Sequence, residues 1–291
     1  MILIIHGSST KTEWCLLDKN GVIEQFISDG INPLFQSRIE ISRIIRLQLP
    51  QSFFTTRLSN IYYYGVECSS EKMKNIVKSP LETQLKASAT VATNLQGIAL
   101  SLFRRNPGIA CILDSESNSC FYNGNEIVRN IPSIGYILGD HGSSVSLGKR
   151  FLGDCLQGLA PNSLSDLFYK KNKIKPEGIM EYIYTNQHPC RLLSVISYFL
   201  YENMDEPYVY NLIYNDMKVF LERNILQYDD FGSYRIRFVG SIAKMYSAIL
   251  KDAAAGLGIS IDHITESPMK GLIKYHQEEL QTLNMRTTAT K

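Results

Sequence analysis

Strand-like patterns open the chain. Residues 1–6 are apolar and rich in β-branched side chains, residues 12–17 again favour a strand, and residues 22–28 favour a third one. A Gly-Ser-Ser turn follows the first of these segments and an Asn-Gly turn follows the second, and such turns are typical of β-hairpins. The pattern therefore predicts a hairpin continued by a third strand.

The same order of elements returns in the second half. Strands are predicted at 109–113, 119–122 and 126–130. The other predicted elements are helices over 37–47, 70–85 with a break at Pro80, 94–104, 191–203, 208–228 and 242–255, strands over 61–66, 87–91 and 235–239, and a last helix starting at Ser267 and Pro268. We infer an α/β fold that contains an internal duplication of a three-strand unit.

The composition is that of a soluble globular protein. Of the 291 residues, 44% are hydrophobic and 20% are charged, and the length suits two domains. A net charge of +2 provides no general field for polyanions, so we exclude nucleic-acid binding. The six cysteines form no C-x-x-C pair, and no apolar run nears the roughly 18 residues that span a bilayer. We therefore expect reduced thiols, no membrane segment and a cytoplasmic location.

Three glycine turns follow predicted strands, at residues 7–11, 139–143 and 240–241. Each turn exposes backbone N–H groups, and hydroxyl groups or Lys11 accompany them, which suits phosphate oxygens. Any one of these turns taken alone is better explained by glycine permitting a tight hairpin. Their recurrence in both halves of the chain favours anion binding.

Blocks spread over nearly the whole chain carry a resemblance. In order they read SSTKTEWCLL, SDGINP, YYYGVECSSEK, GIACIL, SNSCFYNGNEIVRNIPSIGYILGD, GSSVSLGKR, FVGSIA and SPMKGLIKYH. The chain resembles the bacterial N-acetylglucosamine kinases of the BadF/BadG/BcrA/BcrD ATPase family, within the sugar kinase, Hsp70 and actin superfamily. The resemblance implies two ribonuclease H-like (actin-like ATPase) domains flanking a central cleft, with domain I at 1–112 plus 268–291 and domain II at 113–267. It also implies phosphoryl transfer from MgATP to an amino sugar.

Four departures from the family's motifs fall on this chemistry. His6 stands where the family has the aspartate that orders hydrated Mg²⁺, and Asn94 stands where it has the catalytic-base aspartate. The Gly-Thr-Gly phosphate loop reads Asp-Ser-Glu at residues 114–116, which puts carboxylates where phosphates would lie. His141 replaces a glutamate. One like-charge contact near 4 Å costs on the order of 4 kcal/mol, so ATP binding in the family's manner should suffer.

The resemblance assigns roles by matching positions. Asn94 takes the catalytic position, Asn32, Asn118, Gly139 and Asp140 take sugar-binding positions, and Ser9, Thr10, Lys11, Ser115, Ser117, Gly240 and Ser241 take nucleotide-binding positions. The alternative for the asparagines and Asp140 is turn stabilisation by side chain to backbone hydrogen bonds. For Lys11 the alternative is a solvated surface lysine.

Three functions remain open. The lost acids predict little or no kinase activity with a retained pocket for an amino sugar such as N-acetylglucosamine, so ATP and Mg²⁺ are expected for the family and are doubtful for this chain. The alternatives are an active kinase that uses substitute groups, such as Asp140 or a water as base, and a non-enzymatic sugar sensor, partner subunit or ligand-free homologue. Tyrosine-rich helices in domain II offer a surface for a homodimer.

A transition-metal site is a further alternative. A transition metal could bind in place of MgATP if two imidazoles and two carboxylates converge, namely those of His6, His141, Asp114 and Glu116. Their spacing matches none of the usual zinc motifs, so we expect no metal ligands.

Overall fold

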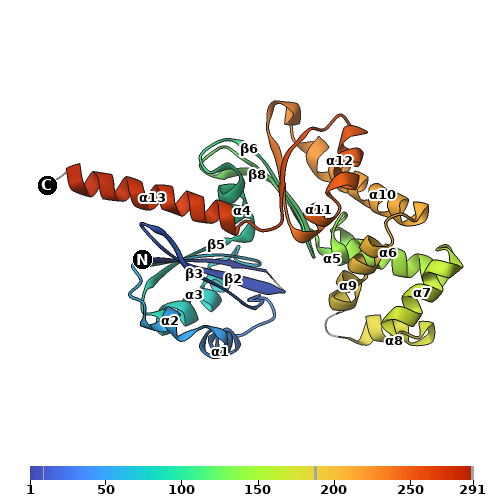
Figure 1. The fold of residues 1–291 in the computed structure, drawn as a ribbon, viewed down its shortest axis with the longest axis horizontal. Coiled ribbons are helices and arrows are strands. Elements are labelled where there is room, and N and C mark those ends of the chain that lie inside the picture. The colour runs from blue at the N-terminus through green and yellow to red at the C-terminus, as the bar shows by residue number, and fades with distance from the viewer. Residues whose placement is uncertain (9, 187–188, 290–291) are drawn as a thin grey trace. The chain divides into compact units, whose positions relative to one another are not determined.

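The computed structural model describes residues 1–8, 10–186 and 189–289, with side chains described up to residue 282. The chain forms two compact units, shown in Figure 1. Unit 1 comprises Met1–Asn106, Tyr122–Ile127 and Ser267–Lys291, and unit 2 comprises Pro107–Phe121 and Val128–Glu266. The domain limits expected from the sequence stay a prediction.

Unit 1 is built on a five-stranded mixed sheet with the order β3-β2-β1-β4-β5. Its strands are β1 (Ile2–Gly7), β2 (Lys11–Asp18), β3 (Gly21–Asp29), β4 (Asn60–Gly65) and β5 (Ser88–Thr93). β1 pairs antiparallel with β2 and parallel with β4, and β4 pairs parallel with β5. The register places Gly7, Gly65 and Thr93 side by side, so the carboxyl ends of the three parallel strands meet at one edge of the sheet.

Helices cover both faces of this sheet (Figure 1). They are α1 (Arg38–Gln48), α2 (Gln51–Thr55), α3 (Glu71–Leu85), α4 (Asn94–Phe103) and α13 (Met269–Ala289). α1 and α3 pack together on one face, and α4 and α13 pack together on the other. The alternation along β1 explains the two faces, because Leu3 and Ile5 face the core that α1 and α3 cover.

The predicted break at Pro80 is wrong. α3 runs without interruption from Glu71 to Leu85 and contains Pro80. Proline removes one backbone N–H donor, which costs stability but does not end a helix whose packed face continues. Val77, Leu81 and Leu85 carry that buried face past the proline.

Unit 2 repeats the sheet of unit 1. Its strands are β6 (Gly108–Leu113), β7 (Ser117–Tyr122), β8 (Ile127–Ile131), β9 (Ile236–Val239) and β10 (Ile261–Thr265). The order β10-β9-β6-β7-β8 is the order of unit 1 read from the other edge, and β9 lies parallel to β6 and β10. This repetition confirms the predicted duplication. β10 was not predicted from the sequence, because this edge strand has few apolar positions and is only partly buried.

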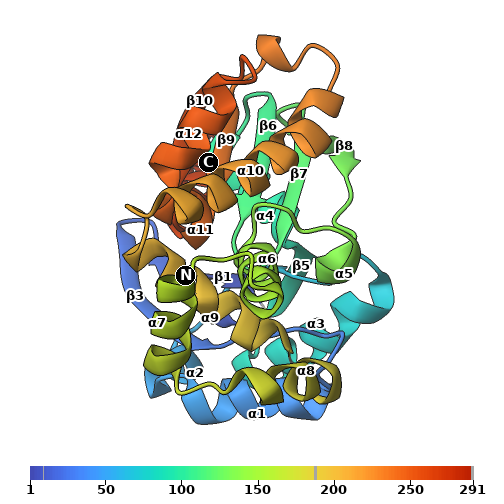
Figure 2. The ribbon, with the colours of Figure 1, turned by 90° about the vertical axis from the view of Figure 1, so that its right-hand side faces the viewer.

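The helices of unit 2 are more numerous. They are α5 (Gly135–Leu138), α6 (Ser144–Gln157), α7 (Asn162–Asn172), α8 (Pro176–Thr185), α9 (Pro189–Glu202), α10 (Pro207–Asn224), α11 (Ser241–Met245) and α12 (Ser247–Ala255), with 3-10 turns η1 (Ile225–Gln227) and η2 (Phe231–Ser233). Figure 2 turns α10 and the strands β6 and β7 toward the viewer. Phe220 of α10 packs on Phe238 of β9, which joins helix and sheet in one core.

The predicted helix over 242–255 is divided in two. The backbone at Tyr246 leaves helical geometry, with ψ at 29°, and separates α11 from α12. Tyr246 is fully buried, so its packing overrides local helix propensity. Among the described residues, no helix combines the length and the apolar character needed to cross a bilayer. The predicted α/β fold class with two sheet-based units is confirmed.

Candidate functional site

A pocket of about 260 Å³ lies within unit 2. Its lining residues come from the start of β7, the end of β8 and the segment after it, the turn before α6, the end of α10 and the 3-10 turn η1: Ser117, Ile131, Pro132, Ser133, Ile134, Gly139, Asp140, His141, Arg223, Asn224 and Gln227. Four residues singled out from the sequence, Ser117, Gly139, Asp140 and His141, therefore meet at one concave site. Figure 2 shows β7, which contains Ser117, and the helices α5 and α6, between which the other three lie.

Asp140 is the most constrained polar group of this pocket. Its backbone adopts the left-handed conformation, with φ at 59°, and its side chain is nearly buried. Oδ1 accepts a hydrogen bond from the Ser133 hydroxyl at 3.0 Å and a long one from the Ser117 backbone N–H at 3.4 Å. Burial raises the pKa of Asp140 above its ordinary value, although these hydrogen bonds oppose the shift. The carboxylate is thus fixed in place at the pocket wall.

Sequence patterns did not identify the polar residues at the end of α10 and just after it. Arg223 and Asn224 end this helix, Gln227 lies in the following 3-10 turn η1, and all three line the pocket. Asn224 is held in place because its Oδ1 accepts a hydrogen bond from the Ser119 hydroxyl at 3.2 Å and its Nδ2 donates to the Phe220 carbonyl at 3.2 Å. Helical periodicity identifies the apolar face of α10 but does not show which polar residues beyond it reach a cavity.

Asn118 lies on β7 and is absent from the pocket lining. Its Oδ1 accepts hydrogen bonds from the Asn130 side chain at 2.9 Å and from the Ser119 backbone N–H at 2.8 Å. Asn130 also donates to the Ser119 carbonyl, so this amide cluster joins β7 to β8. A sugar-binding role for Asn118 stays a prediction.

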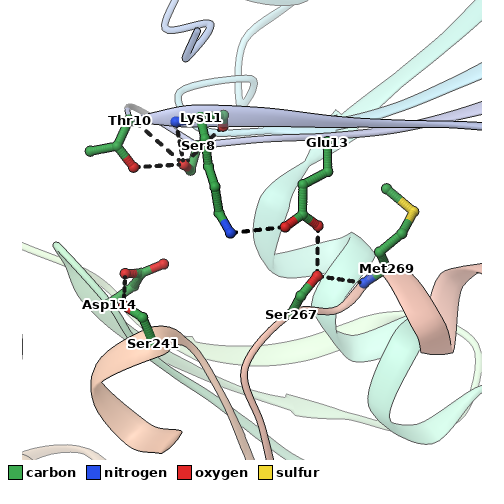
Figure 3. Close-up of polar contacts among 8 residues, drawn as sticks. All are labelled: Ser8, Thr10, Lys11, Glu13, Asp114, Ser241, Ser267 and Met269. Atoms are coloured by element: carbon green, nitrogen blue, oxygen red, sulfur yellow. Dashed lines mark hydrogen bonds and ion pairs between the residues drawn. The ribbon is translucent and has the colours of Figure 1, made fainter. Parts of the chain in front are cut away.

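Within unit 2, a hydrogen bond joins the loop at residues 114–116 to the turn at residues 240–241. The Ser241 hydroxyl donates a hydrogen bond of 2.6 Å to Oδ1 of Asp114, shown in Figure 3. Asp114 also accepts the Ser144 N–H at its carbonyl, at 2.9 Å, and its own N–H donates to the Glu116 carbonyl. The loop after β6, which contains Ser115, and the turn after β9 are therefore joined through an acidic side chain.

Gly240 explains why these turns approach so closely. Its φ is 131°, and a Cβ atom at this position would lie 2.0 Å from the Leu113 carbonyl oxygen. Only glycine permits that backbone conformation and that contact. Gly240 and Ser241 thus stand directly beside the end of β6.

In unit 1, the turn between β1 and β2 is closed by its own hydrogen bonds. The Ser8 hydroxyl donates to the Lys11 carbonyl at 3.0 Å and accepts from the backbone N–H groups of Thr10 and Lys11 at 3.4 and 3.2 Å. Figure 3 shows Thr10 beside Ser8. Ser9 lies outside the described residues. These N–H groups therefore already have an oxygen acceptor within the loop.

Lys11 also belongs to a polar cluster around Glu13. Its ammonium group lies 2.9 Å from Oε1 of Glu13, and the Ser267 hydroxyl donates to Oε2 at 2.6 Å (Figure 3). Ser267 in turn accepts the N–H of Met269 at the start of α13. Burial alone raises the pKa of Glu13, but the bonds from Ser267 and Lys11 outweigh burial and lower it. Lys11 is half-exposed and paired with Glu13, and its role as an anion contact stays a prediction.

His6 lies in the middle of the unit 1 sheet. Its strand register pairs it with Glu13 on β2 and with Tyr64 on β4. Burial lowers its pKa to about 4, against a smaller opposing effect of Glu13. Nε2 is buried and has no hydrogen-bond partner among the described residues. A neutral imidazole in this position supplies no hard oxygen ligand for Mg²⁺.

Asn94 and Asn32 occupy different parts of unit 1. Asn94 opens α4 directly after Thr93, at the sheet edge where β1, β4 and β5 end, and its Oδ1 accepts the Leu95 N–H at 2.8 Å. Asn32 is nearly buried in the turn after β3, where its Oδ1 accepts the Leu34 N–H at 3.0 Å. Both side chains accept hydrogen bonds from nearby backbone N–H groups. The catalytic position of Asn94 and the sugar-binding position of Asn32 stay predictions.

No group of three or more His, Cys, Asp or Glu side chains that could hold a metal ion is found in residues 1–8, 10–186 and 189–289. Within that part of the chain, the transition-metal alternative has no supporting geometry.

Three solved structures show what the chain is similar to. A candidate N-acetylglucosamine kinase from Porphyromonas gingivalis has 34% sequence identity and a TM-score of 0.91, over 96% of this chain and 99% of that chain. A candidate N-acetylglucosamine kinase from Chromobacterium violaceum has 14% identity and a TM-score of 0.71, over 94% of this chain and 98% of that chain.

The third structure is a ROK family glucokinase from Streptomyces griseus in complex with glucose and AMPPNP, with 9% identity and a TM-score of 0.57, over 94% of this chain and 97% of that chain. At 14% and 9% identity, the second and third structures establish a shared fold alone. No family model matches the chain, and no curated protein matches it.

Proposed function

The chain belongs to the family of the Porphyromonas gingivalis candidate N-acetylglucosamine kinase, and from this premise we propose that it binds an N-acetylamino sugar and performs little or no phosphoryl transfer. The finer assignment to the BadF/BadG/BcrA/BcrD ATPase family is part of this proposal and rests on the sequence blocks given above. The proposal places the sugar in the unit 2 pocket.

The pocket carries the proposal. Its volume of about 260 Å³ lies just below the range of roughly 300–1,000 Å³ typical of small-molecule sites, which suits a monosaccharide better than a nucleoside triphosphate. The Asp140 carboxylate offers hydroxyl groups a charged acceptor, and Ile131, Pro132 and Ile134 offer an apolar wall. A sugar ring presents both kinds of surface, hydroxyl groups and C–H groups.

The phosphate-related residues do not fit MgATP. Asp114 holds the Ser241 hydroxyl with a carboxylate, Lys11 is paired with Glu13, and the Ser8 hydroxyl already accepts the N–H groups of its loop. Partial burial lowers the pKa of His6, which favours its neutral form. Within each unit, the groups that the resemblance assigns to phosphate binding therefore already have partners or carry negative charge.

An active kinase is the second candidate function. The observation that favours it is 34% identity to the Porphyromonas gingivalis protein over nearly the whole length of both chains. Such a kinase needs a base other than Asn94, because an amide cannot accept the proton of a hydroxyl group at neutral pH. If the protein is an active kinase, the nucleoside of ATP would bind at Gly240 and Ser241.

Two assays on the full chain test the proposal. Calorimetric titration with N-acetylglucosamine should show binding that is at least about 10-fold weaker in Asp140→Asn, because the variant keeps the shape and loses the charged acceptor. Lys251→Gln, an exposed position on α12, is the matched control and should bind as the wild type does. A wild type without measurable affinity for N-acetylated amino sugars contradicts the proposal.

The second assay couples ADP release to phosphorylation of N-acetylglucosamine. We expect turnover below about 1 per second, the lower end of ordinary enzymes. Turnover at or above that rate supports the active kinase. Combining Asn94→Asp with Asp114→Gly, Ser115→Thr and Glu116→Gly should raise the rate if the altered loop and the missing base limit the reaction.

A further inference from the structure

One imidazole reaches the pocket of unit 2. His141 belongs to the turn between Gly139 and α6, and it is one of the pocket-lining residues. Its side chain is 29% exposed, while its Nδ1 atom is buried. The accessible part of the ring is therefore the edge that carries Nε2.

A buried carboxylate stands behind this ring. Asp216 projects from α10, is fully buried, and its Oδ1 lies 3.5 Å from Nδ1 of His141. Oδ1 also accepts from the Arg150 guanidinium at 3.0 Å, and Oδ2 accepts the Gly142 backbone N–H at 2.8 Å. These contacts fix Asp216 on both of its oxygens.

Asp216 keeps its negative charge. Burial by itself would raise its pKa, but the contacts from His141, Gly142 and Arg150 together lower the pKa below its ordinary value. A buried carboxylate beside a ring nitrogen sets which nitrogen carries the proton. The separation of 3.5 Å exceeds an ordinary hydrogen bond, and such pairs commonly tighten when ligand binds.

We propose that Asp216 orients the His141 imidazole with its proton on Nδ1, so that Nε2 presents a lone pair to the pocket and accepts a hydrogen bond from a hydroxyl group of the bound sugar. This inference rests on the proposed function and names two residues that its pocket needs. His141 is the ligand contact, and Asp216 is a positioning residue that acts through it.

The ligand chemistry follows from the two neighbouring acceptors. The Asp140 carboxylate and Nε2 of His141 both require donors, and adjacent hydroxyl groups of a pyranose supply them. An anionic substituent at the same place would meet the charge of Asp140. The pair therefore selects a sugar with free hydroxyl groups at this wall.

Nitrogen-15 NMR of the full-length protein tests the orientation without any ligand. The wild type should show His141 protonated at Nδ1, which is the less common tautomer of a free imidazole. Asp216→Asn should invert this signature, because its amide can donate to Nδ1 while its oxygen still accepts the Gly142 N–H. A wild-type imidazole protonated at Nε2 overturns the inference.

Calorimetric titration with N-acetylglucosamine tests the contact. A glutamine side chain places an acceptor near the position of Nε2, whereas an asparagine reaches only the position of Nδ1. His141→Gln should therefore keep the affinity within about 3-fold, and His141→Asn and His141→Phe should lower it by about 10-fold or more. Arg129→Gln, which alters an exposed ion pair with Asp229, is the control for general perturbation.

The outcomes separate the two claims. Wild-type affinity in His141→Phe overturns the inference and leaves the proposed function standing. Wild-type protein that binds no amino sugar overturns both, whatever the tautomer. Loss in His141→Phe and His141→Asn with rescue in His141→Gln supports both, because a purely structural role of the ring would not distinguish the two amides.

Discussion

Units 1 and 2 share one strand order, in which β4 and β9 occupy equivalent places. The two strands differ in what packs against the glycine at their carboxyl end. β4 ends at Gly65, where a Cβ atom would lie 2.2 Å from the ring of Tyr63. The counterpart β9 is followed by Gly240, where a Cβ atom would meet the backbone oxygen of Leu113 and where φ is 131°. In unit 1 a side chain fills the space, and in unit 2 a neighbouring backbone does.

A second difference concerns imidazole and carboxylate pairs. In unit 1, the partly buried His6 lies beside Glu13, whose two oxygens are taken by Lys11 and Ser267. In unit 2, Asp216 is the buried partner, and the imidazole of His141 reaches a pocket. The comparison teaches that one duplicated scaffold can hold a closed polar cluster in one copy and a cluster open to a ligand in the other.

The largest expected effect is the loss of stability on replacing Gly240, compared with the loss on replacing Gly65. Gly240→Ala should lower the free energy of unfolding by about 4 kcal/mol or more, because strain adds to a clash with backbone that cannot move away. Gly65→Ala should cost about 1–3 kcal/mol, since its Cβ would meet a side chain, which yields more readily than backbone, and its φ is not in the left-handed region. Denaturant titration measures both, with fluorescence of Trp14, the single tryptophan, reporting unit 1 and hydrogen exchange reporting unit 2. Equal losses would contradict the distinction between side-chain and backbone crowding.

The next effect compares the two carboxylates. Asp216→Asn weakens the hydrogen bonds that a fully buried carboxylate accepts from the Gly142 N–H and from Arg150, and should cost about 2–3 kcal/mol. Glu13→Gln should cost about 1 kcal/mol, because its partner Lys11 is 45% exposed and screened by solvent. The same two-probe denaturation measures both variants. A larger loss for Glu13→Gln would show that the closed cluster, and not the open one, carries more of the stability.

Much of this architecture follows from the sequence. The duplicated strand order was predictable because alternating apolar residues and hairpin turns are local signals, and residues 108–131 carry them as clearly as residues 2–29. β10 gave a weaker signal, since its exposed positions break the apolar pattern. Pro80 misled the prediction because helix packing is a tertiary effect.

The candidate site was predictable only in part. Gly139 and Asp140 stand in a recognisable turn, whereas Asp216 lies in the middle of a helix, where one charged residue at a buried position looks like part of the polar face. Its role emerges only when α10 brings it to Gly142 and Arg150, which are more than 60 residues away. Long-range pairing of this kind leaves no local pattern.

Acid should affect the two units in different pH ranges. Burial lowers the pKa of His6 and of His276 to about 4, so between pH 6.5 and 4 the unfolded state binds protons that the folded state refuses. Stability of unit 1 should therefore fall across that window, by on the order of 2 kcal/mol for one imidazole. The lowered pKa of Asp216 instead keeps its contribution until pH falls below about 3.8.

Denaturation at pH 7 and pH 4.5 measures this difference. The Trp14 midpoint should fall on acidification, and His276→Gln should reduce the fall by about half, because His276 titrates only in the unfolded chain over this range. Exchange protection of α10 in unit 2 serves as the internal reference. A parallel loss in both units would mean that global charge, rather than the buried imidazoles, sets the acid response.

The smallest effects should come from exposed ion pairs, which exist in both units. Arg104 pairs with Glu278 in unit 1, and Arg129 pairs with Asp229 in unit 2 at 3.2 Å. Asp229 is 97% exposed, so water and salt screen its charge, and holding both side chains costs entropy. Glu278→Gln and Asp229→Asn should each change the free energy of unfolding by less than about 0.5 kcal/mol, and added salt should shrink the change further. A loss above about 1 kcal/mol in either variant would assign part of the difference between the units to their surfaces, whereas the expected result leaves it with the buried groups around Glu13 and Asp216.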